Sequence, residues 1–369
     1  MSSSGQGMAA VKSADFQSFV GSISVVIATY NRLSSLRELL DDLSKQSGLK
    51  PWPGATDNPL VDVEVVVVDD GGEAPVLESL SPGAFPFRLE TIRRTNGGPG
   101  AARDTGIRRA SGDIVVILDD DMAIPPEFLA AHQRAHSEGA SVVLGSILPP
   151  RSGTLPLFER FHLEGIQKFG ADFRAGLVEI EGTRLCTGNV SFRRSAYLLV
   201  GGFDLSLNRC EDRDLGIRFE FAGLKFAVAD DGWSEHRSDH EDVGTWRRRC
   251  RLYGELDMQI AAKHPDRPRV SPWAFLPKLP WISRPLVVAA ALFPYVGSQA
   301  AGLAYGLGGA ADRAKCRRMA MVGVSLCYAF EYFSGVGTEL SRRPGRFSVP
   351  KSLVESWRQH FAARKVSRA

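Results

Sequence analysis

The stretch "DIVVILDDDM", residues 113–122, joins an apolar run to a cluster of negative charge. Five apolar residues, 114–118, lead directly into three consecutive carboxylates. A short, β-branched run without polar alternation is typical of a parallel strand covered on both faces. Three adjacent carboxylates repel one another, so their position at a strand end indicates either a bound cation or a solvated acidic turn. On this stretch alone, the two interpretations are equally good.

Two upstream segments share this pattern. "SISVVIATYNR", residues 22–32, ends in a polar loop, and "VDVEVVVVDDGG", residues 61–72, ends in two aspartates and two glycines. Leucines at helical spacing follow the first segment, at positions 33, 36, 39, 40 and 43. Strands that alternate with helices predict a doubly wound, mostly parallel α/β sheet over the first 150 residues. Ligands of such sheets bind beyond the carboxyl ends of the strands, where these polar residues converge.

Composition restricts the class of protein. Apolar content of 44% and charged content of 24% are those of an ordinary folded chain. The net charge of +3 does not indicate a nucleic-acid partner. From Arg342 to the end there are eight Lys or Arg and one acid, which leaves 37 basic and 41 acidic groups in the other 341 residues. The basic excess therefore belongs to the C-terminal tail, and such tails favour anionic surfaces.

The five cysteines are scattered, and none forms a Cys-x-x-Cys pair. This pattern supports neither a zinc knuckle nor a disulfide framework, and it fits a reducing, cytoplasmic location. The N-terminus has no apolar run of signal-peptide length, so residues 1–21 are expected to form a flexible leader.

The C-terminal third changes character. Residues 255–284 predict a linker rich in proline and aromatics, and 285–338 an apolar helical hairpin. No charge occurs between Arg284 and Asp312, and Glu331 interrupts the second apolar run. Two full spans would place the basic loop "DRAKCRR" outside the cell, so a hairpin on or in the cytoplasmic leaflet is favoured. Packing onto the preceding α/β domain or a dimer partner is the alternative.

The tail, residues 339–369, is predicted to be basic and amphipathic. It places Leu353, Val354, Trp357 and Phe361 on one helical face, which is the pattern of an interfacial helix.

Side-chain alternation along an extended chain predicts that Asp119 and Asp121 point the same way and Asp120 the opposite way. Two carboxylates on one side suit a hard cation, Mg²⁺ or Mn²⁺. The glycine-rich "NGGPGAARDTG", residues 96–106, allows close backbone approach to a ligand, and Arg103 offers a cation for phosphate. By itself it is better explained as a loop into a helix.

A second acidic pair, Glu211 and Asp212, begins the predicted helix "EDRDLGIRFEFAG". One of these carboxylates could accept a proton from a hydroxyl, and helix capping explains them equally well. His236 is a candidate imidazole ligand, although taken alone a surface histidine is the simpler interpretation.

The order and spacing of these motifs together resemble the family 2 glycosyltransferases, which have the GT-A fold. The resemblance covers about residues 22–254, the expected catalytic domain. The motifs are "SVVIATYNR", "VVVVDDGG", "NGGPGAARDTGIRRASGDIVVILDDD", "TGNVSFRRSAYLLVGGFD", "CEDRDLGIRFEFAGLKFAV" and "EHR". It implies a hexosyltransferase that moves a sugar from a nucleotide-diphosphate donor to an acceptor hydroxyl, with Mg²⁺ or Mn²⁺ and with inversion. It also implies a lipid-linked, polysaccharide or glycolipid acceptor at the cytoplasmic face of the cell membrane.

The resemblance assigns expected roles residue by residue. Asp212 is the base with Glu211 in support; Ala28, Tyr30, Arg32, Asp70, Arg103 and Asp120 bind the nucleotide sugar; Asp119, Asp121 and His236 lie at the metal, the first and last aspartates forming the Asp-x-Asp motif. The chain departs from the family in a proline-rich insertion around Trp52 and in "GGEA" where the family often has "GSTD".

Two other functions compete with this one. A sugar-phosphate nucleotidyltransferase usually needs a lysine in its N-terminal glycine-rich loop, and "ATYNRLSS" has none. A non-catalytic nucleotide-sugar-binding protein would not need the intact Asp121, Asp212 and Arg103. The sequence identifies neither the sugar, nucleotide, acceptor and linkage position nor the oligomeric state.

Overall fold

The computed structural model describes residues 20–73, 80–81, 83–150, 155–207, 209–237 and 242–342. The chain forms two compact units, which are treated separately below. The first comprises Met1–Gly153 and Lys168–Ser238, and the second Thr154–Gln167 and Asp239–Ala369. Nearly all of the predicted leader and the amphipathic segment of the predicted tail lie outside the described residues.

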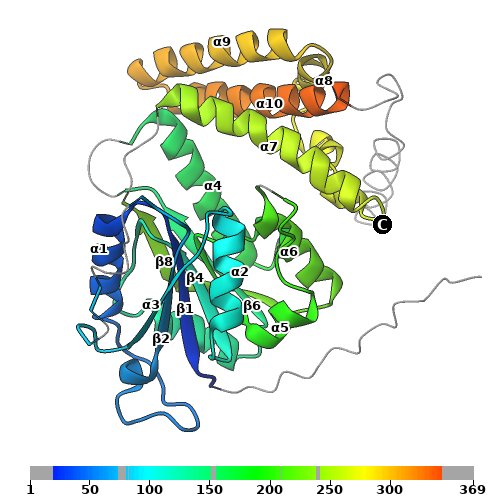
Figure 1. The fold of residues 1–369 in the computed structure, drawn as a ribbon. Helices are drawn as coiled ribbons and strands as arrows, with labels where there is room; N and C mark the ends of the chain where they lie inside the picture. Colours follow the sequence, from blue (N-terminus) through cyan, green and yellow to red (C-terminus); the bar gives the residue numbers. More distant parts are fainter. Residues whose placement is uncertain are drawn as a thin grey trace, which may run out of the picture. The chain divides into compact units, whose positions relative to one another are not determined.

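The first unit is built on one eight-stranded sheet (Figure 1). The strand order is β3-β2-β1-β4-β7-β6-β8-β5, and the first four strands are parallel. Strand β7 runs antiparallel to both β4 and β6, and β5 runs antiparallel to β8. The strands are β1 (Ile23–Thr29), β2 (Glu64–Asp69), β3 (Arg88–Arg93), β4 (Ile114–Asp119), β5 (Met122–Ala123), β6 (Val142–Leu148), β7 (Asn189–Arg193) and β8 (Phe226–His236).

Helices cover both faces of this sheet, which confirms the predicted doubly wound α/β fold. Helices α1 and α3 pack on one face, and α2, α5 and α6 on the other. The helices of this unit are α1 (Leu33–Leu43), α2 (Pro99–Arg109), α3 (Phe128–Ser137), α5 (Arg194–Leu199), α6 (Glu211–Phe221) and the short 3-10 helices η1 (Pro59–Asp62) and η3 (Gly182–Arg184). Helix α4 (Leu157–Arg174) crosses the boundary between the two units.

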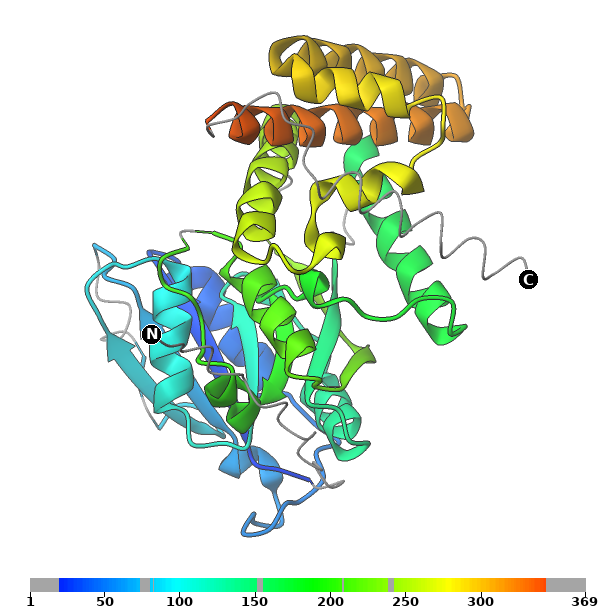
Figure 2. The same cartoon turned by 90° about the vertical axis from the view of Figure 1, so that its right-hand side faces the viewer.

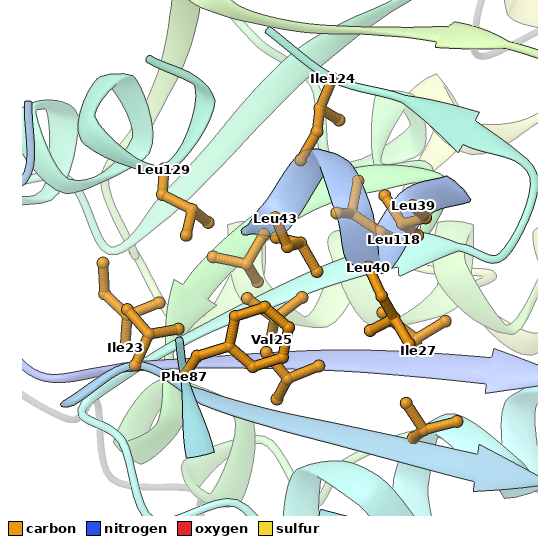
Figure 3. Close-up of a cluster of buried hydrophobic side chains, with 14 of the residues drawn as sticks. Ile23, Val25, Ile27, Leu39, Leu40, Leu43, Phe87, Leu118, Ile124 and Leu129 are labelled. Atoms are coloured by element: carbon orange, nitrogen blue, oxygen red, sulfur yellow. The ribbon is translucent and has the colours of Figure 1, made fainter. Parts of the chain in front are cut away.

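The apolar runs of the central strands explain why both faces are covered. Successive residues of β1 alternate between two cores: Val25 and Ile27 pack with α1, while Val26 packs with α2. Figure 3 shows the first core, where Leu40 and Leu43 of α1 approach the strands. A strand that is apolar at every position can only be stable when helices bury both of its sides. The central strands therefore hold the polar residues that follow them at fixed positions.

The second unit is helical. Its elements are α7 (Val243–Lys263), α8 (Arg284–Leu292), α9 (Pro294–Arg313), α10 (Arg317–Ser341) and the 3-10 helices η4 (Pro268–Val270) and η5 (Pro272–Lys278). Figure 2 shows α8 and α9 along one flank of α10. Among the described residues, α10 alone is long and apolar enough to cross a membrane, and 67% of its most apolar window is buried. The central helix of a folded bundle has the same length and composition.

Candidate functional site

The polar residues that follow β1, β2 and β4 meet at one edge of the sheet. These strands are parallel neighbours, with Thr29 opposite Asp69 and Ala28 opposite Asp119 in the register. Their carboxyl ends therefore reach the same edge, as the sequence predicted. Ala28 is half-buried within β1, and Tyr30, just beyond its end, is 49% exposed.

A buried arginine joins three elements at this edge. Arg103, on α2, places Nη2 2.5 Å from Asp119 Oδ1 at the end of β4. Its Nη1 lies 3.1 Å from Glu211 Oε1 at the start of α6. Gly100, one turn earlier on α2, allows this approach, since a Cβ there would lie 3.0 Å from Glu211 Cγ. The two acidic clusters of the sequence, about 90 residues apart, are thus parts of one site.

The three aspartates after β4 do not alternate as an extended strand would require. Strand β4 ends at Asp119, and Asp120 and Asp121 lie in a turn. Arg32 Nη1 lies 3.3 Å from Asp120 Oδ1 and 2.8 Å from Asp121 Oδ2, so one guanidinium holds both carboxylates. The alternation argument was therefore wrong in its geometry, because a turn replaces the strand beyond Asp119. The expected roles of the three residues stay predictions.

Asp121 has one carboxylate oxygen in an unusual state. Its Oδ1 is buried and accepts no hydrogen bond within the part of the chain that the structure describes. The antiparallel pairing of β5 with β8 sets Met122 opposite His236, which brings His236 Nδ1 to 3.5 Å from this oxygen. Burial opposes ionisation, but the His236 imidazole and the Arg32 guanidinium hold the pKa of Asp121 below its ordinary value. Asp121 is therefore an ionised carboxylate with an oxygen left for a ligand.

The described residues contain no ready-made cluster of three or more His, Cys, Asp or Glu side chains that could hold a metal ion.

The pKa of Asp120 is shifted in the opposite direction from that of Asp121. Burial raises its pKa, despite the hydrogen bond that Thr29 Oγ1 donates to Asp120 Oδ2 at 2.7 Å and the charge of Arg32. Asp121 is thus the more strongly charged of the two.

Asp70 is held by the glycine-rich loop. Its Oδ2 accepts the backbone N–H of Gly98 at 2.8 Å, and its Oδ1 accepts that of Gly97 at 3.1 Å. Arg94 also pairs with this carboxylate. Gly98 has a φ of +87°, a backbone conformation that favours glycine, and it precedes the first residue of α2. Asp70 therefore fixes the loop that leads into α2, the helix that carries Arg103. The expected contact of Asp70 with the nucleotide stays a prediction.

Helix α6 presents the second acidic pair at its N-terminus, where backbone N–H groups favour negative charge. Its position depends on a close crossing with η3, since a Cβ on Gly216 would lie 2.0 Å from Gly182 O. Burial raises the pKa of Asp212, and the neighbouring charge of Asp212 together with burial raises the pKa of Glu211. Both carboxyl groups therefore hold protons to a higher pH than an ordinary acid does.

The structure adds two residues that the sequence argument left out. Thr29 donates to Asp120, as described above. Gly188 faces Asp119, because a Cβ there would lie 3.1 Å from Asp119 Oδ2. Both lie inside quoted motifs, "ATYNR" and "TGNVSF", so their motif membership was the available signal. Their contacts depend on the fold and could not be predicted from spacing.

The raised pKa of Asp212 makes a prediction about stability. A carboxyl with a raised folded-state pKa destabilises the fold above that pKa, and the effect disappears as the pH falls towards its unfolded-state value. We expect Asp212→Asn to raise Tm at neutral pH by a few degrees, since each pKa unit is worth about 1.4 kcal/mol. The gain should vanish near pH 4. Thermal unfolding followed by circular dichroism measures both.

Asp62→Asn is the matched control. Hydrogen bonds from the Thr56 backbone and side chain lower the pKa of this partly exposed carboxyl in the same unit, so its replacement should leave Tm unchanged or lower it at neutral pH. A neutral-pH Tm for Asp212→Asn at or below that of the wild type would contradict the prediction.

The chain was compared with known proteins. Residues 24–198 match the family model described as Glycosyl transferase family 2. Validoxylamine A glucosyltransferase of Streptomyces hygroscopicus subsp. jinggangensis is 27% identical over 297 residues, which are 72% of this chain and 64% of that protein. Pre-mycofactocin glycosyltransferase of Mycobacterium tuberculosis is 29% identical over 66% of this chain and 48% of that protein. The matched regions thus span less than two thirds of these relatives.

Among solved structures, the mannosyltransferase PcManGT from Pyrobaculum calidifontis, in complex with GDP-Man and Mn²⁺, has a TM-score of 0.58. The likeness covers 88% of each chain at 20% sequence identity, so it concerns the fold. The family model begins in β1 and ends in α5, and it contains the glycine-rich loop, Arg103 and all three aspartates of the β4 end. The segment of residues 24–198 therefore matches glycosyl transferase family 2, and the GT-A fold of the first unit agrees with that match.

Proposed function

We propose that this chain is a hexosyltransferase that moves a sugar from a nucleotide-diphosphate sugar to an acceptor hydroxyl. The observation that carries the proposal is the single edge at which Arg103 joins Asp119 to Glu211, next to Asp212. Such a transfer needs one carboxylate that binds the metal ion of the donor and a second carboxylate that accepts the proton of the acceptor hydroxyl. The family match and the names of the relatives support the same reaction class.

Asp212 is the proposed base, and Glu211 supports it. The raised pKa of Asp212 makes it a stronger base at neutral pH than a carboxylate with an ordinary pKa. The Arg213 N–H donates to Asp212 Oδ1 at 2.7 Å, and the Thr187 backbone also donates to this carboxylate, so its orientation is fixed. Attack from this side, opposite the leaving nucleoside diphosphate, would invert the anomeric carbon.

Arg103 acts mainly by position in this proposal. Both of its terminal nitrogens are engaged by carboxylates, and the side chain is only 9% exposed. It would therefore hold Asp119 and Glu211 at a fixed separation and add positive charge beneath the diphosphate. Ala28, Tyr30 and Asp70 are proposed to lie near the nucleotide, whose identity we leave open.

The residues at the β4 end fit a divalent cation, Mg²⁺ or Mn²⁺. Such ions are commonly held by one or two carboxylates, with substrate phosphates and water completing the shell, so a three-residue protein cluster is not required. Asp121, whose buried Oδ1 lies 3.5 Å from His236 Nδ1, and Asp119 would hold the ion, with His236 beside it. When bound, the ion would stabilise the charge that develops on the departing diphosphate. The Mn²⁺ in the mannosyltransferase structure supports this assignment.

The Arg32 guanidinium pairs with Asp120 and Asp121, the carboxylates beside which a bound metal ion would lie. It is about half-exposed, so it can leave the carboxylates of Asp120 and Asp121. We expect Arg32→Gln to tighten Mn²⁺ binding without donor on the order of tenfold, because the competing cation is removed. Isothermal titration calorimetry measures this affinity directly.

Arg88→Gln is the control for that experiment. Arg88 is also partly exposed and pairs with a buried carboxylate, Glu64, but at the amino ends of the strands. It should leave Mn²⁺ affinity unchanged. Unchanged or weaker Mn²⁺ binding by Arg32→Gln would show that Arg32 does not compete for this site.

The reaction itself is tested with a panel of nucleotide sugars and Mn²⁺, following release of the nucleoside diphosphate. Asp212→Asn and Asp121→Ala should each reduce turnover by about 10²- to 10⁴-fold, whereas Asp62→Asn should not. Because only the ionised base accepts a proton, kcat/KM should fall as the pH drops through a pKa above the ordinary 3.8. Wild-type turnover in both site variants would rule out the assigned roles.

We further propose a lipid-linked, polysaccharide or glycolipid acceptor and a location at the cytoplasmic face of the cell membrane. The uncharged residues 285–311 and the basic C-terminus support this location. In this proposal, residues 22–254 form the catalytic domain, 255–284 the linker, 285–338 the apolar hairpin and 339–369 the basic tail.

A further inference from the structure

Exposed apolar side chains are concentrated in one part of the second unit. Of the 19 large apolar residues that are exposed among the described residues, eleven lie between positions 281 and 322. Isolated exposed apolar residues are normal on any protein, but a continuous group marks a contact surface. We define the α8–α9 apolar face by six of these eleven residues, each more than 60% exposed: Trp281 before α8, Phe293 between α8 and α9, and Tyr295, Val296, Leu303 and Leu307 on α9.

The face is defined without α10, although Met319 and Val322 in the first part of that helix are also exposed. Most of α10 is packed against its neighbours: a Cβ on Gly335 would lie 1.9 Å from Arg251 O on α7. A Cβ on Gly323 would lie 2.6 Å from Gly308 Cα on α9. Such backbone contacts leave no room for lipid between the helices. The helix that passes the length test for a membrane span is therefore the core of this unit.

A buried ion cluster in the middle of α10 strengthens this conclusion. Glu331, 2% exposed, accepts hydrogen bonds from Arg247 Nε at 2.8 Å and Arg251 Nη2 at 2.9 Å, both on α7. Ser298 Oγ of α9 donates to it at 3.0 Å. Separating the two arginines from Glu331 would leave a buried charge without its partners, at a large cost. The bundle therefore meets a membrane as a folded unit, through its outer face.

The charges around the face indicate what covers it. No residue from 285 to 311 is charged, and the corner between α9 and α10 then presents four exposed cations, of which Arg317 also pairs with Glu164 of α4 at 2.8 Å. We name Arg313, Lys315, Arg317 and Arg318 the basic corner. Apolar and aromatic side chains beside exposed cations are the composition of surfaces that lie in the interface of an anionic bilayer. A second copy of the chain would bring a second basic corner to the contact, with no acid in 285–311 to pair with it.

We propose that the α8–α9 apolar face lies in the headgroup region of an anionic phospholipid membrane, with the basic corner on the lipid headgroups and α10 never inserted. This inference rests on the membrane location proposed above and names the surface responsible for it. The chain then binds as a peripheral protein.

The test is flotation of the full chain with vesicles of phosphatidylcholine, with and without about a third phosphatidylglycerol. The wild type should float with the anionic vesicles. The double variant Leu303→Glu/Leu307→Glu should partition into these vesicles at least tenfold more weakly than the wild type. Raised salt should weaken binding of the wild type. Leu177→Glu is the matched control, because Leu177 and Leu307 are both 73% exposed and Leu177 lies in the first unit.

Donor turnover without vesicles separates this inference from the proposed reaction. The double variant should keep wild-type turnover, so a loss of binding alone concerns the surface. Failure of the wild type to bind anionic vesicles, or equal binding by the double variant, would overturn the proposal. So would loss of binding in Trp357→Glu alone, which would assign it to the tail. A wild-type dimer that the double variant converts to monomer, measured by light scattering, would assign the face to a second copy.

Discussion

The site depends on one buried guanidinium. Arg103 is almost inaccessible to water, and a cation in that position is stable only while both of its carboxylate partners are in place. The partners come from the end of β4 and the start of α6, and Arg103 itself comes from α2. Each of these elements is in turn fixed by the core on its face of the sheet. The ion pairs therefore fix the separation of the Asp119 and Glu211 carboxylates.

This edge of the sheet has more carboxylates than the arginines that pair with them, Arg32, Arg94 and Arg103. Burial raises the pKa values of Asp120, Glu211 and Asp212, so their charged forms are unfavourable in the free protein. Asp121 remains ionised and keeps one oxygen without a hydrogen-bond donor among the described residues. This is the state expected of a site whose electrostatics are completed by a ligand. Removing one of these charges is therefore expected to stabilise the free fold at neutral pH.

The sequence was sufficient for the four parallel strands β3, β2, β1 and β4 and for the carboxylates that follow them. The apolar runs ending at Thr29, Asp69 and Asp119 predicted parallel strands, and parallel strands must bring those ends together. It was not sufficient for the geometry among neighbours. Strand periodicity could not show that β4 stops at Asp119, because that depends on where the short β5 pairs with β8. The link from Arg103 to Glu211 joins residues 108 positions apart, and only the packed fold brings them within 3.1 Å.

The central claim is that Arg103 makes one site from two acidic clusters, and a lysine at that position tests it most directly. Lysine keeps the charge but cannot direct two nitrogens to two separate carboxylates. The measurement is turnover of an accepted nucleotide sugar by Arg103→Lys, corrected for the folded fraction seen by circular dichroism. The account predicts a loss of at least about a hundredfold, comparable with that of Arg103→Gln. Near wild-type turnover by the folded Arg103→Lys chain would contradict it.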